Sequence, residues 1–389
     1  MAIDLRQVAA VAGVSVSTAS RALRGEDRVS KRTAARVQAA AAQLGYQPNA
    51  SARALRTARS EFIGLVVTNL MNTSFHTIAE VVQRDLSSRG YRLLLSITGG
   101  DPEQEHAALS TLVANSAAGV IVVGSDDGAA GELHTYGTPT VHLARRPASL
   151  AGDCVLGNDI DGGRLATEHL LRLGHHRIAI ITGPQEVQSA RERLQGYWLA
   201  MRAAAVSVPD VLIQSGPLSP DWGAHATGLL LSQPAGTRPT GLIVASHEAS
   251  YGALPRLREQ PVSIPEELSV ICYEDSPLAR WWHPAITVVD NNARQMGELA
   301  AQRLLLRLDH ATRGVPAGEF SEFRVGVRLI ERDSCGQFSS DGCGNQPPIT
   351  GWLPQPSEPP SGAMGLWGRK LLEGPVLRDR NESVGVDRG

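Results

Sequence analysis

The chain contains 389 residues, and at about 150 residues per domain this length predicts two or three domains. Hydrophobic residues make up 42% and charged residues 20%, which is typical of a globular protein and excludes a collagen-like, fully disordered or disulfide-framework chain. The sequence contains no run of roughly 18 apolar residues, the length that a membrane helix needs. Asp4 stands where a secretory signal would carry basic residues, so we expect a cytoplasmic protein with no membrane partner.

The formal net charge of -2 hides an uneven distribution along the chain. Residues 1–60 contain ten Lys and Arg against three Asp and Glu, so this segment carries +7 and the rest of the chain carries -9. A basic head on an acidic body predicts that one small domain contacts a polyanion while the rest has another role. The alternative is a solvated basic face that has no partner.

The first 46 residues predict three short helices. Apolar residues recur at helical spacing from Leu5, stop at Gly13, and resume in a second helix that begins near Val16. Ser30 is a candidate N-cap for the third helix, and Gly45 is its stop signal. Two helices around a glycine turn with a third behind them are typical of a helix-turn-helix, whose second helix enters the major groove of DNA. A three-helix fold that binds no DNA is the alternative.

The second helix would present its first turns to DNA. Arg21 can form the bidentate contact to guanine that is the commonest specific pairing, and Val16 and Ser17 would face base edges beside it. Phosphate contacts are predicted for three further polar residues, which are Thr18, Ser20 and Asn49. Pro48 breaks the chain after this domain, and residues 47–60 form a linker whose alanine-rich part is too short to be a stable helix alone.

From Phe62 the pattern changes to short apolar runs that alternate with amphipathic stretches of helical length. This alternation predicts an α/β fold of βαβ units, with parallel sheets that helices cover on both faces. Ligands of such sheets bind beyond the carboxyl ends of the strands, so the segment after each run is a candidate binding segment. The pattern stops near Asp333, and the residues 334–389, rich in Gly, Pro and Ser, are predicted to be a disordered tail.

Several segments, in order along the chain, resemble the lactose/galactose-repressor (LacI/GalR) family of bacterial transcriptional regulators. These segments are Leu5–Leu23, Leu44–Arg56, Gly174–Ala179, Val262–Val270 and Pro284–Val289. The resemblance extends over about residues 3–333. It implies a helix-turn-helix DNA-binding domain at 1–46, a hinge helix at 47–60 and an effector-binding and dimerisation domain at 61–333. The last domain would have two lobes of doubly wound parallel sheets, similar to periplasmic binding proteins.

The resemblance also implies a role for the hinge. In the family, this segment folds into a helix on specific DNA, pairs with the hinge of the second subunit, and presses a leucine into the minor groove. Leu55 matches that leucine. Such an apolar wedge costs a few kcal/mol of unstacking, which the resulting DNA bend offsets. The alternative is a core position in a short linker helix, which the charged neighbours Arg53 and Arg56 disfavour.

The resemblance places the effector between the two lobes. Arg193 matches a family arginine that grips hydroxyls or a carboxylate, although a surface position on a helix is the alternative. Glu274 takes the place of a pocket aspartate. We expect five further side chains in the pocket, namely Ser74, Phe75, His247, Glu248 and Trp281. Trp281 and its neighbour Trp282 would stack on the apolar face of a sugar or pack in the core of a lobe.

Two departures from the family pattern change the predicted chemistry of this pocket. His247-Glu248 follow the strand that ends at Val244, where family members usually have an Asn-Asp pair. Ala144 replaces an aspartate that many members carry after an earlier strand. The pocket thus loses an acid and gains an imidazole, so an ordinary hexose is not implied.

Catalytic and metal sites have weaker support in the sequence. His175 and His176 are interpreted as a polar helix end, since no Asp, Glu or Cys accompanies them at metal-ligand spacing. No full dinucleotide-binding or nucleophile-elbow motif is present, and the four cysteines, with no Cys-x-x-Cys spacing, are expected to be free thiols. We therefore predict no cofactor, no metal and no catalytic residue.

The predicted function is a homodimeric, nucleoid-associated repressor that reads a near-palindromic operator in double-stranded DNA. A small effector, a sugar or sugar-like metabolite, would control its DNA affinity. Two alternatives remain. One is a sugar-sensing module with a degenerate DNA head, and the other is a DNA-tethered hydrolase in which Glu248 and Glu274 act as a carboxylate pair.

Overall fold

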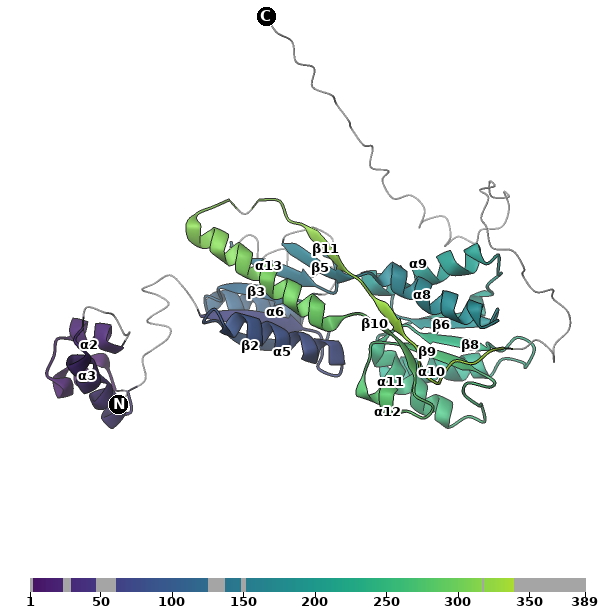
Figure 1. Cartoon of the computed structure of the whole chain (residues 1–389), viewed down its shortest axis with the longest axis horizontal. Helices are drawn as coiled ribbons and strands as arrows, with labels where there is room; N and C mark the ends of the chain where they lie inside the picture. The colour runs from purple at the N-terminus through teal and green to yellow at the C-terminus, as the bar shows by residue number, and fades with distance from the viewer. Residues whose placement is uncertain are drawn as a thin grey trace, which may run out of the picture. The chain divides into compact units, whose positions relative to one another are not determined.

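The computed structural model describes residues 3–23, 29–46, 61–124, 137–147, 152–316 and 318–338. These residues form a three-helix head and two α/β lobes (Figure 1). The predicted hinge at 47–60, with Asn49 and Leu55, lies outside the described residues, as does the chain after Phe338.

The head contains α1 (Leu5–Ala12), α2 (Val16–Leu23) and α3 (Lys31–Leu44). Asp4 and Gln7 cap α1 reciprocally, and Gly13 ends it in the left-handed conformation (φ 62°) that glycine adopts without strain. Ser30 caps α3, and Gly45 ends it. The predicted glycine turn and the predicted start of the second helix are therefore confirmed. The core of the head is mostly Ala and Val, whose small side chains let three short helices pack closely.

The N-terminal lobe is built on a parallel six-stranded sheet in the order β11-β5-β4-β3-β1-β2. Its strands are β1 (Phe62–Val67), β2 (Arg92–Ile97), β3 (Gly119–Val122), β4 (Thr140–Leu143), β5 (Asp153–Gly157) and β11 (Glu322–Val325). The helices α5 (Thr73–Ser87) and α13 (Ala293–Arg313) pack on one face. The helix α6 (Pro102–Ala114) packs on the other.

The C-terminal lobe has a second six-stranded sheet, in the order β12-β10-β9-β8-β6-β7. It is parallel except for β12, which pairs antiparallel with β10. The strands are β6 (Ile178–Thr182), β7 (Ile213–Ser215), β8 (Gly241–Val244), β9 (Ser269–Tyr273), β10 (Thr287–Asp290) and β12 (Arg328–Ile330), with a 3-10 turn, η1 (Asp210–Leu212), before β7. One face is covered by α8 (Asp159–Arg172) and α9 (Gln188–Ala203), and the other by α10 (Pro220–Leu231), α11 (His247–Arg258) and α12 (Pro277–Trp281).

The described chain crosses between the lobes after β5, after β10 and after β11. These crossings hold the two sheets side by side (Figure 1). The segments that follow β4, β8 and β9 meet in the crevice between the lobes. The segments that were expected to bind a ligand therefore lie together at the crevice, and their role in binding stays a prediction.

One strand departs from the expectation that helices cover both faces of each sheet. β2 is the edge strand of its sheet, and Leu94, Leu95 and Ile97 are exposed on it. An edge strand leaves backbone groups unpaired as well, so this part of the lobe is suited to contact another molecule.

The predicted end of the two-lobed domain at Asp333 is wrong, because packing continues to Phe338. Ser334 is fully buried and donates a hydrogen bond to the carbonyl of Val270 at 2.6 Å. The backbone N–H of Phe338 donates to the carbonyl of Leu173 at 2.8 Å. The sequence pattern missed this extension because its contacts are single polar residues and backbone groups rather than an apolar run.

His175 is a second correction. It was expected at a polar helix end, but it is 1% exposed and lies in the turn before β6. Its Nδ1 lies 3.1 Å from the hydroxyl of Thr240, and its Nε2 lies 3.1 Å from the carbonyl oxygen of Gly336. Burial lowers the pKa of His175 to about 4. This histidine is therefore a neutral part of the core that holds the chain near residue 336.

Candidate DNA-reading head and effector pocket

The exposed face of α2 carries the residues that were predicted to read DNA. Ser17 and Arg21 are exposed and Val16 is 45% exposed, whereas Ala19 and Ala22 are buried against the other helices of the head. The helical period thus leaves one face of α2 free of packing. This face combines an apolar group, a hydroxyl and a guanidinium, the groups that contact thymine methyls and base edges in the major groove.

The predicted phosphate contacts lie at the start and on the flank of α2. The amide of Thr18 donates to the hydroxyl of Ser15 at 3.1 Å, so Ser15 caps the helix. Thr18 and Ser20 are both half-buried. The N–H groups of the first turn suit a phosphate oxygen, because a helix N-terminus carries partial positive charge.

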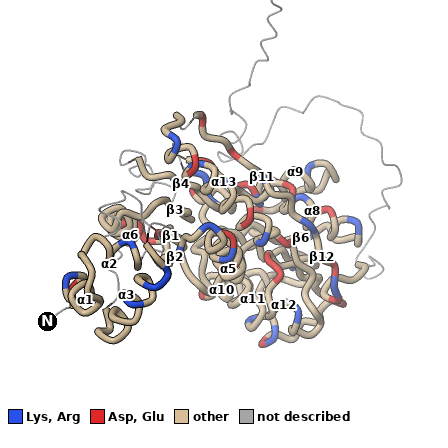
Figure 2. Tube along the Cα trace, turned by 60° about the vertical axis from the view of Figure 1, so that its left-hand side comes forward, with Lys and Arg blue, Asp and Glu red and all other residues tan. Residues whose placement is uncertain are grey.

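Arg36 has a structural role that the charge count did not reveal. Its Nη2 donates to the carbonyl oxygen of Ala12 at 2.7 Å and so joins α3 to the end of α1. Four other basic residues of the head, Arg6, Arg21, Lys31 and Arg32, are exposed. Figure 2 marks the positions of the described Lys and Arg along the backbone trace. Arg36 is exposed as well, so among the described residues it adds to this basic surface while it stabilises the turn between the first two helices.

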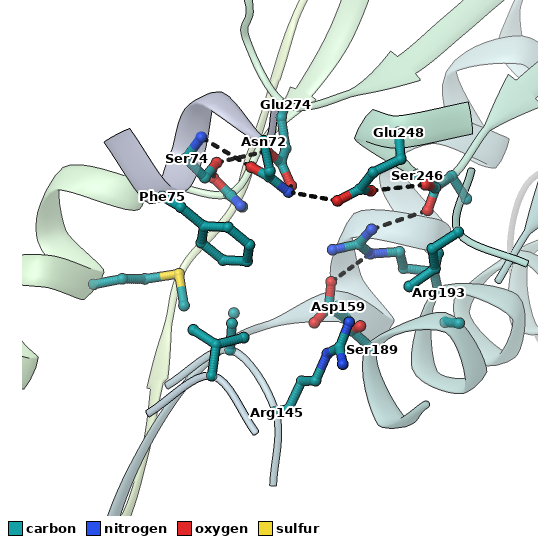
Figure 3. Close-up of a pocket in the computed structure, with 18 of the residues that line it drawn as sticks. Asn72, Ser74, Phe75, Arg145, Asp159, Ser189, Arg193, Ser246, Glu248 and Glu274 are labelled. Carbon is teal, nitrogen blue, oxygen red and sulfur yellow. Dashed lines mark hydrogen bonds and ion pairs between the residues drawn. The ribbon is translucent and has the colours of Figure 1, made fainter. Parts of the chain in front are cut away.

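A cavity of about 60 Å³ lies between the two lobes (Figure 3). Its polar lining consists of Asn72, Ser74, Arg145, Asp159, Ser189, Arg193, Ser246, Glu248, Glu274 and Asn291. Its apolar lining includes Phe75, Ile78, Val123, Ala144, Leu218 and Met296. This volume holds only a few water molecules, so the described conformation has a closed cleft.

Arg193 and Asp159 form a buried ion pair in this cavity. Arg193 Nε lies 2.6 Å from Asp159 Oδ1, and its Nη1 donates to the carbonyl of Ala245 at 2.9 Å. The helices α8 and α9 approach closely enough for this pair because a Cβ on Gly163 or Gly196 would lie 2.0 Å from a backbone oxygen of the other helix. Burial alone would lower the pKa of Arg193, but the carboxylate of Asp159 outweighs this effect and raises it. The guanidinium is therefore charged and fixed in position.

Two glutamates of the C-terminal lobe bind the start of α5 across the cleft. Glu274 accepts hydrogen bonds from Ser74 Oγ at 2.7 Å and from Asn72 Nδ2 at 3.2 Å. Glu248 accepts from Asn72 Nδ2 at 3.4 Å and from Asn69 Nδ2 at 3.2 Å. The partial positive charge at the start of α5 attracts both carboxylates. These hydrogen bonds join the two lobes directly.

Two features distinguish these glutamates: the pKa of Glu248 is shifted, and the backbone of Glu274 has an unusual conformation. Burial raises the pKa of Glu248, but hydrogen bonds, including that from Asn69, and the nearby His247 lower it by more. Glu274 has a left-handed backbone (φ 70°), as does Ala144 (φ 60°) in the other lobe. Non-glycine residues in this conformation cost about 1 kcal/mol or more and cluster at ligand sites.

Of the seven predicted effector residues, Ser74, Phe75, Arg193, Glu248 and Glu274 line the cavity. Figure 3 shows Phe75 facing it across from Arg193 and Asp159. Their role in effector binding stays a prediction. His247 is not in the lining but lies fully buried behind it, with Nδ1 at 3.8 Å from Glu274 Oε2.

Trp281 does not line the cavity. It is 84% exposed, because α12 ends at this residue and leaves its side chain in solvent. The prediction that Trp281 stacks on a sugar in this cavity is therefore wrong. Its neighbour Trp282 packs against the core of the C-terminal lobe, which was the alternative for this pair.

Sequence reasoning missed Asp159, and it included Asn72 and Arg145 only within candidate segments without naming them as site residues. Asp159 begins α8 directly after β5, and β5 was not recognised because its apolar part is very short. Asn72 is the N-cap of α5, which its position before Ser74 could have indicated. Arg145 follows β4 within the segments expected to bind a ligand.

In the part of the chain that the structure describes, no group of three or more His, Cys, Asp or Glu side chains is placed to hold a metal ion. Cys154, Cys272 and Cys335 are free thiols, and Cys343 lies outside the described residues. No described helix combines the length and apolar character that crossing a membrane requires.

Comparison with known proteins decides the family. Residues 4–49 match the model for bacterial regulatory proteins of the lacI family, and residues 167–335 match the periplasmic binding protein-like domain. The chain is 32% identical over 311 residues to the ribose operon repressor of Escherichia coli (strain K12), which spans 79% of this chain and 94% of that protein. The chain belongs to the lacI family of bacterial regulatory proteins.

Other lacI-family proteins support this assignment. The HTH-type transcriptional repressor PurR of Haemophilus influenzae (strain PittEE) is 30% identical over 332 residues, or 85% of this chain and 98% of that protein. The lac repressor dimer bound to operator and the anti-inducer ONPF superposes with a TM-score of 0.72, at 26% identity over 86% of this chain and 100% of that chain. The CelR-cellobiose complex gives 0.63, at 30% identity over 85% and 99%.

Membership of the lacI family confirms the predicted fold class, an α/β two-lobed domain behind a helix-turn-helix head. It also confirms the predicted function: the protein is a DNA-binding transcriptional repressor with an effector domain, and not an enzyme. The hydrolase alternative is thereby excluded.

Proposed function

We propose that this lacI-family protein is a homodimer whose two heads read a near-palindromic operator and whose DNA affinity is set by a small polar effector. The observation that carries this proposal is the closed cleft in which Arg193, Glu248 and Glu274 of one lobe face α5 of the other. A ligand that prefers one arrangement of the lobes shifts the population toward it, with a coupling of about 1–3 kcal/mol to DNA binding. Such a protein acts in the cytoplasm, at the nucleoid.

On the operator, α2 lies in the major groove. Arg21 donates to a guanine, while Val16 and Ser17 contact neighbouring base edges. Hydrogen bonds to phosphates come from Thr18, Ser20 and Asn49. The paired hinges at 47–60 place Leu55 in the minor groove, where the bend offsets the cost of unstacking. The exposure of Ser17 and Arg21 supports this role and disfavours a degenerate head.

The effector is a sugar or sugar-like metabolite. Phe75 and Met296 supply apolar surface, and Arg193, Glu248 and Glu274 supply hydrogen-bonding groups. A lining of this kind suits a ring whose faces are apolar and whose edges carry hydroxyls. The names of two relatives, the ribose operon repressor and the CelR-cellobiose complex, support a sugar.

The exposed strand β2 is the proposed dimer face of the N-terminal lobe. Leu94, Leu95 and Ile97 are 38%, 43% and 55% exposed, and they stand on a strand edge. An exposed apolar edge is an aggregation hazard unless another surface covers it. A two-fold axis would bring the same strand of a second copy onto it, as isologous dimers require.

The first test is a selection of bound duplexes from a random DNA library with the purified full chain, at one fixed salt concentration and without sugar. Salt must be fixed because phosphate contacts make affinity strongly salt-dependent. We expect a near-palindromic consensus with a central pyrimidine–purine step. The operator proposal would be contradicted if no duplex were enriched, either without sugar or with any sugar of the panel described below. That outcome would favour the sugar-sensing module.

The second test identifies the effector class by thermal unfolding of the full chain with D-ribose, D-glucose and cellobiose. A ligand of the folded state raises the unfolding temperature in proportion to its occupancy. We expect at least one of these sugars to do so in the parent and not in Arg193→Met. Arg202→Ala, an exposed position on the same helix, is the matched control and should respond as the parent does.

A further inference from the structure

The cavity between the lobes has a second rim, opposite the hydrogen bonds that join the lobes at the start of α5. Arg145 of the N-terminal lobe and Ser189 of the C-terminal lobe line this rim, across the cavity from Ser74 (Figure 3). Their chain neighbours Arg146 and Gln188 contact each other, since the amide of Arg146 donates to Gln188 Oε1 at 3.0 Å. The two lobes are therefore joined at this rim as well.

An ion pair crosses between the lobes beside this hydrogen bond. Glu192 lies on α9, one turn after Gln188. Its carboxylate accepts two hydrogen bonds from Arg324 on β11, one from Nη2 to Oε1 at 2.9 Å and one from Nη1 to Oε2. Such a two-point contact between a guanidinium and a carboxylate is stronger and more specific in its geometry than a single hydrogen bond. Because β11 belongs to the N-terminal sheet, the pair fixes α9 to the other lobe.

Five residues complete a closed ring of polar contacts around this pair. Gln188 Nε2 donates to Glu192 Oε1, so the amide contact and the ion pair are linked. Arg324 Nε donates to Glu322 Oε1 at 2.8 Å, and Glu322 Oε2 lies 3.1 Å from Arg146 Nε. We call Arg146, Gln188, Glu192, Glu322 and Arg324 the α9 ring. Each member has two partners in the ring, and the ring includes residues of both lobes.

The central pair is partly shielded from water. The side chain of Glu192 is 12% exposed and that of Arg324 is 32% exposed. The hydrogen bond to Glu192 raises the pKa of Arg324 and outweighs the effect of burial, which lowers it, so the guanidinium is charged. The pair still lies within reach of ions in solution, because neither side chain is fully buried. Salt should therefore weaken the attraction across the rim.

We propose that Glu192 and Arg324 are positioning residues that hold the cleft closed at the α9 rim. They act through Ser189 and Arg193, the residues of α9 that line the cavity, by keeping this helix against the N-terminal lobe. Opening the cleft at this rim separates the lobes and breaks the α9 ring. The inference rests on the proposed function only in taking this cleft as the effector pocket. An effector that favours the open cleft then acts against the ring, and one that favours the closed cleft acts with it.

Lobe closure is measured in the full chain by energy transfer between two dyes, without DNA or sugar. Ser87→Cys at the end of α5 and Ser232→Cys after α10 carry the dyes, in a background with Cys335→Ser and Cys343→Ser. Both label positions are exposed and belong to different lobes. An excess of unlabelled chain ensures that the transfer occurs within one copy. We expect the ratio of closed to open molecules to fall about threefold or more between about 0.05 M and about 0.5 M KCl.

Two glutamate variants decide whether the ion pair across the rim is responsible. Glu192→Gln removes the charge at nearly constant size, and we expect a ratio of closed to open molecules about threefold or more below that of the parent, with a weaker response to salt. Glu168→Gln is the matched control, because its partner Arg164 lies on the same helix, and it should respond as the parent does. A parent without a salt response, an unchanged ratio in Glu192→Gln, or an equal fall in both variants would overturn the proposal.

A third variant tests the contact itself and covers the case in which Glu192→Gln does not fold. Arg324→Gln should lower the ratio as Glu192→Gln does. In the double variant the fall should be smaller than the product of the two single falls, because both substitutions remove the same contact. Falls that multiply fully would mean that the two residues act on closure through separate contacts, and this result would also contradict the proposal. Since neither DNA nor sugar is added, failure here and failure of the DNA selection are separate results.

Discussion

Ser74 in the N-terminal lobe donates a 2.7 Å hydrogen bond to Glu274 in the C-terminal lobe. The two residues stand 200 positions apart in the sequence, at the first turn of α5 and just after β9. The bond can form only when the lobes are closed, because the two residues belong to different lobes. Contacts made by the protein itself therefore stabilise the closed cleft.

Ser74→Ala should shift the chain toward an open cleft. A hydrogen bond to a charged group contributes about 1.5–3 kcal/mol, so the ratio of closed to open molecules should fall about 10- to 100-fold. Energy transfer between dyes on the two lobes measures this ratio at constant pH and salt concentration. Thr77→Ala is the matched control, since its hydroxyl bonds within α5. An equal shift in both variants would mean that helix stability, and not the contact with Glu274, sets closure.

Arg193→Met should destabilise the fold as well as abolish the effector response. It leaves Asp159 buried without its partner, which costs about 3–5 kcal/mol. The double variant Arg193→Met/Asp159→Leu removes both charges and should recover most of this stability without recovering effector binding. Urea unfolding measures the first effect, and thermal shift with the identified sugar measures the second. A double variant that still binds the sugar would assign recognition to other residues.

Leu95→Glu should break the dimer. The substitution places a carboxylate on the β2 edge, where the second copy would bring an identical charge onto the two-fold axis. Sedimentation at several protein concentrations should give a monomer, against a dimer for the parent. Leu199→Glu, on α9 and exposed to a similar degree, is the control and should remain dimeric. Loss of the dimer in Leu199→Glu alone would move the interface to α9.

Arg21→Ala should cost about 1–3 kcal/mol on the selected operator and relax the preference at one base pair. The comparison uses binding to the operator and to all single-base variants of it at one salt concentration. Arg32→Ala, exposed at the start of α3, should weaken binding to every sequence alike. If Arg21→Ala also weakens all sequences equally, Arg21 contacts phosphate and another residue reads that base.

Stability should fall in mild acid because of His175. Burial lowers its pKa from 6.5 to about 4 in the folded chain, so the unfolded chain takes up the proton first. The stability is fully present above about pH 6.5 and is lost as pH falls toward 4. By about pH 4.5 the loss amounts to about 2–3 kcal/mol. Urea unfolding of His175→Gln should show a smaller loss over this range, and parallel curves would contradict the account.

The sequence predicted the head in detail because its signals are local. A capping residue, a glycine in the left-handed region and an apolar period of helical spacing act within one turn of chain. The exposed face of α2 follows from them, since Ala19 and Ala22 must point inward. The α/β class of the lobes was predictable for a similar reason, because strands buried on both faces are continuous apolar runs.

The edges of the fold were less predictable. β5, β11 and β12 are short or polar, and the segment to Phe338 is held by backbone hydrogen bonds that leave no pattern in the side chains. The position of Trp281 was also not predictable from the sequence pattern. An aromatic residue near a pocket segment suggests stacking, but the end of α12 decides that its side chain faces solvent.

The sequence by itself determined which chemical groups this protein carries, including the family positions of Arg193 and Glu274. Only the tertiary structure decided their partners. Asp159 meets Arg193 because two glycines let α8 and α9 approach, and Ser74 meets Glu274 because the chain crosses between the lobes. Such contacts depend on packing over long separations in the chain, for which local propensity carries no information. The α9 ring, which joins the two lobes, is of this kind.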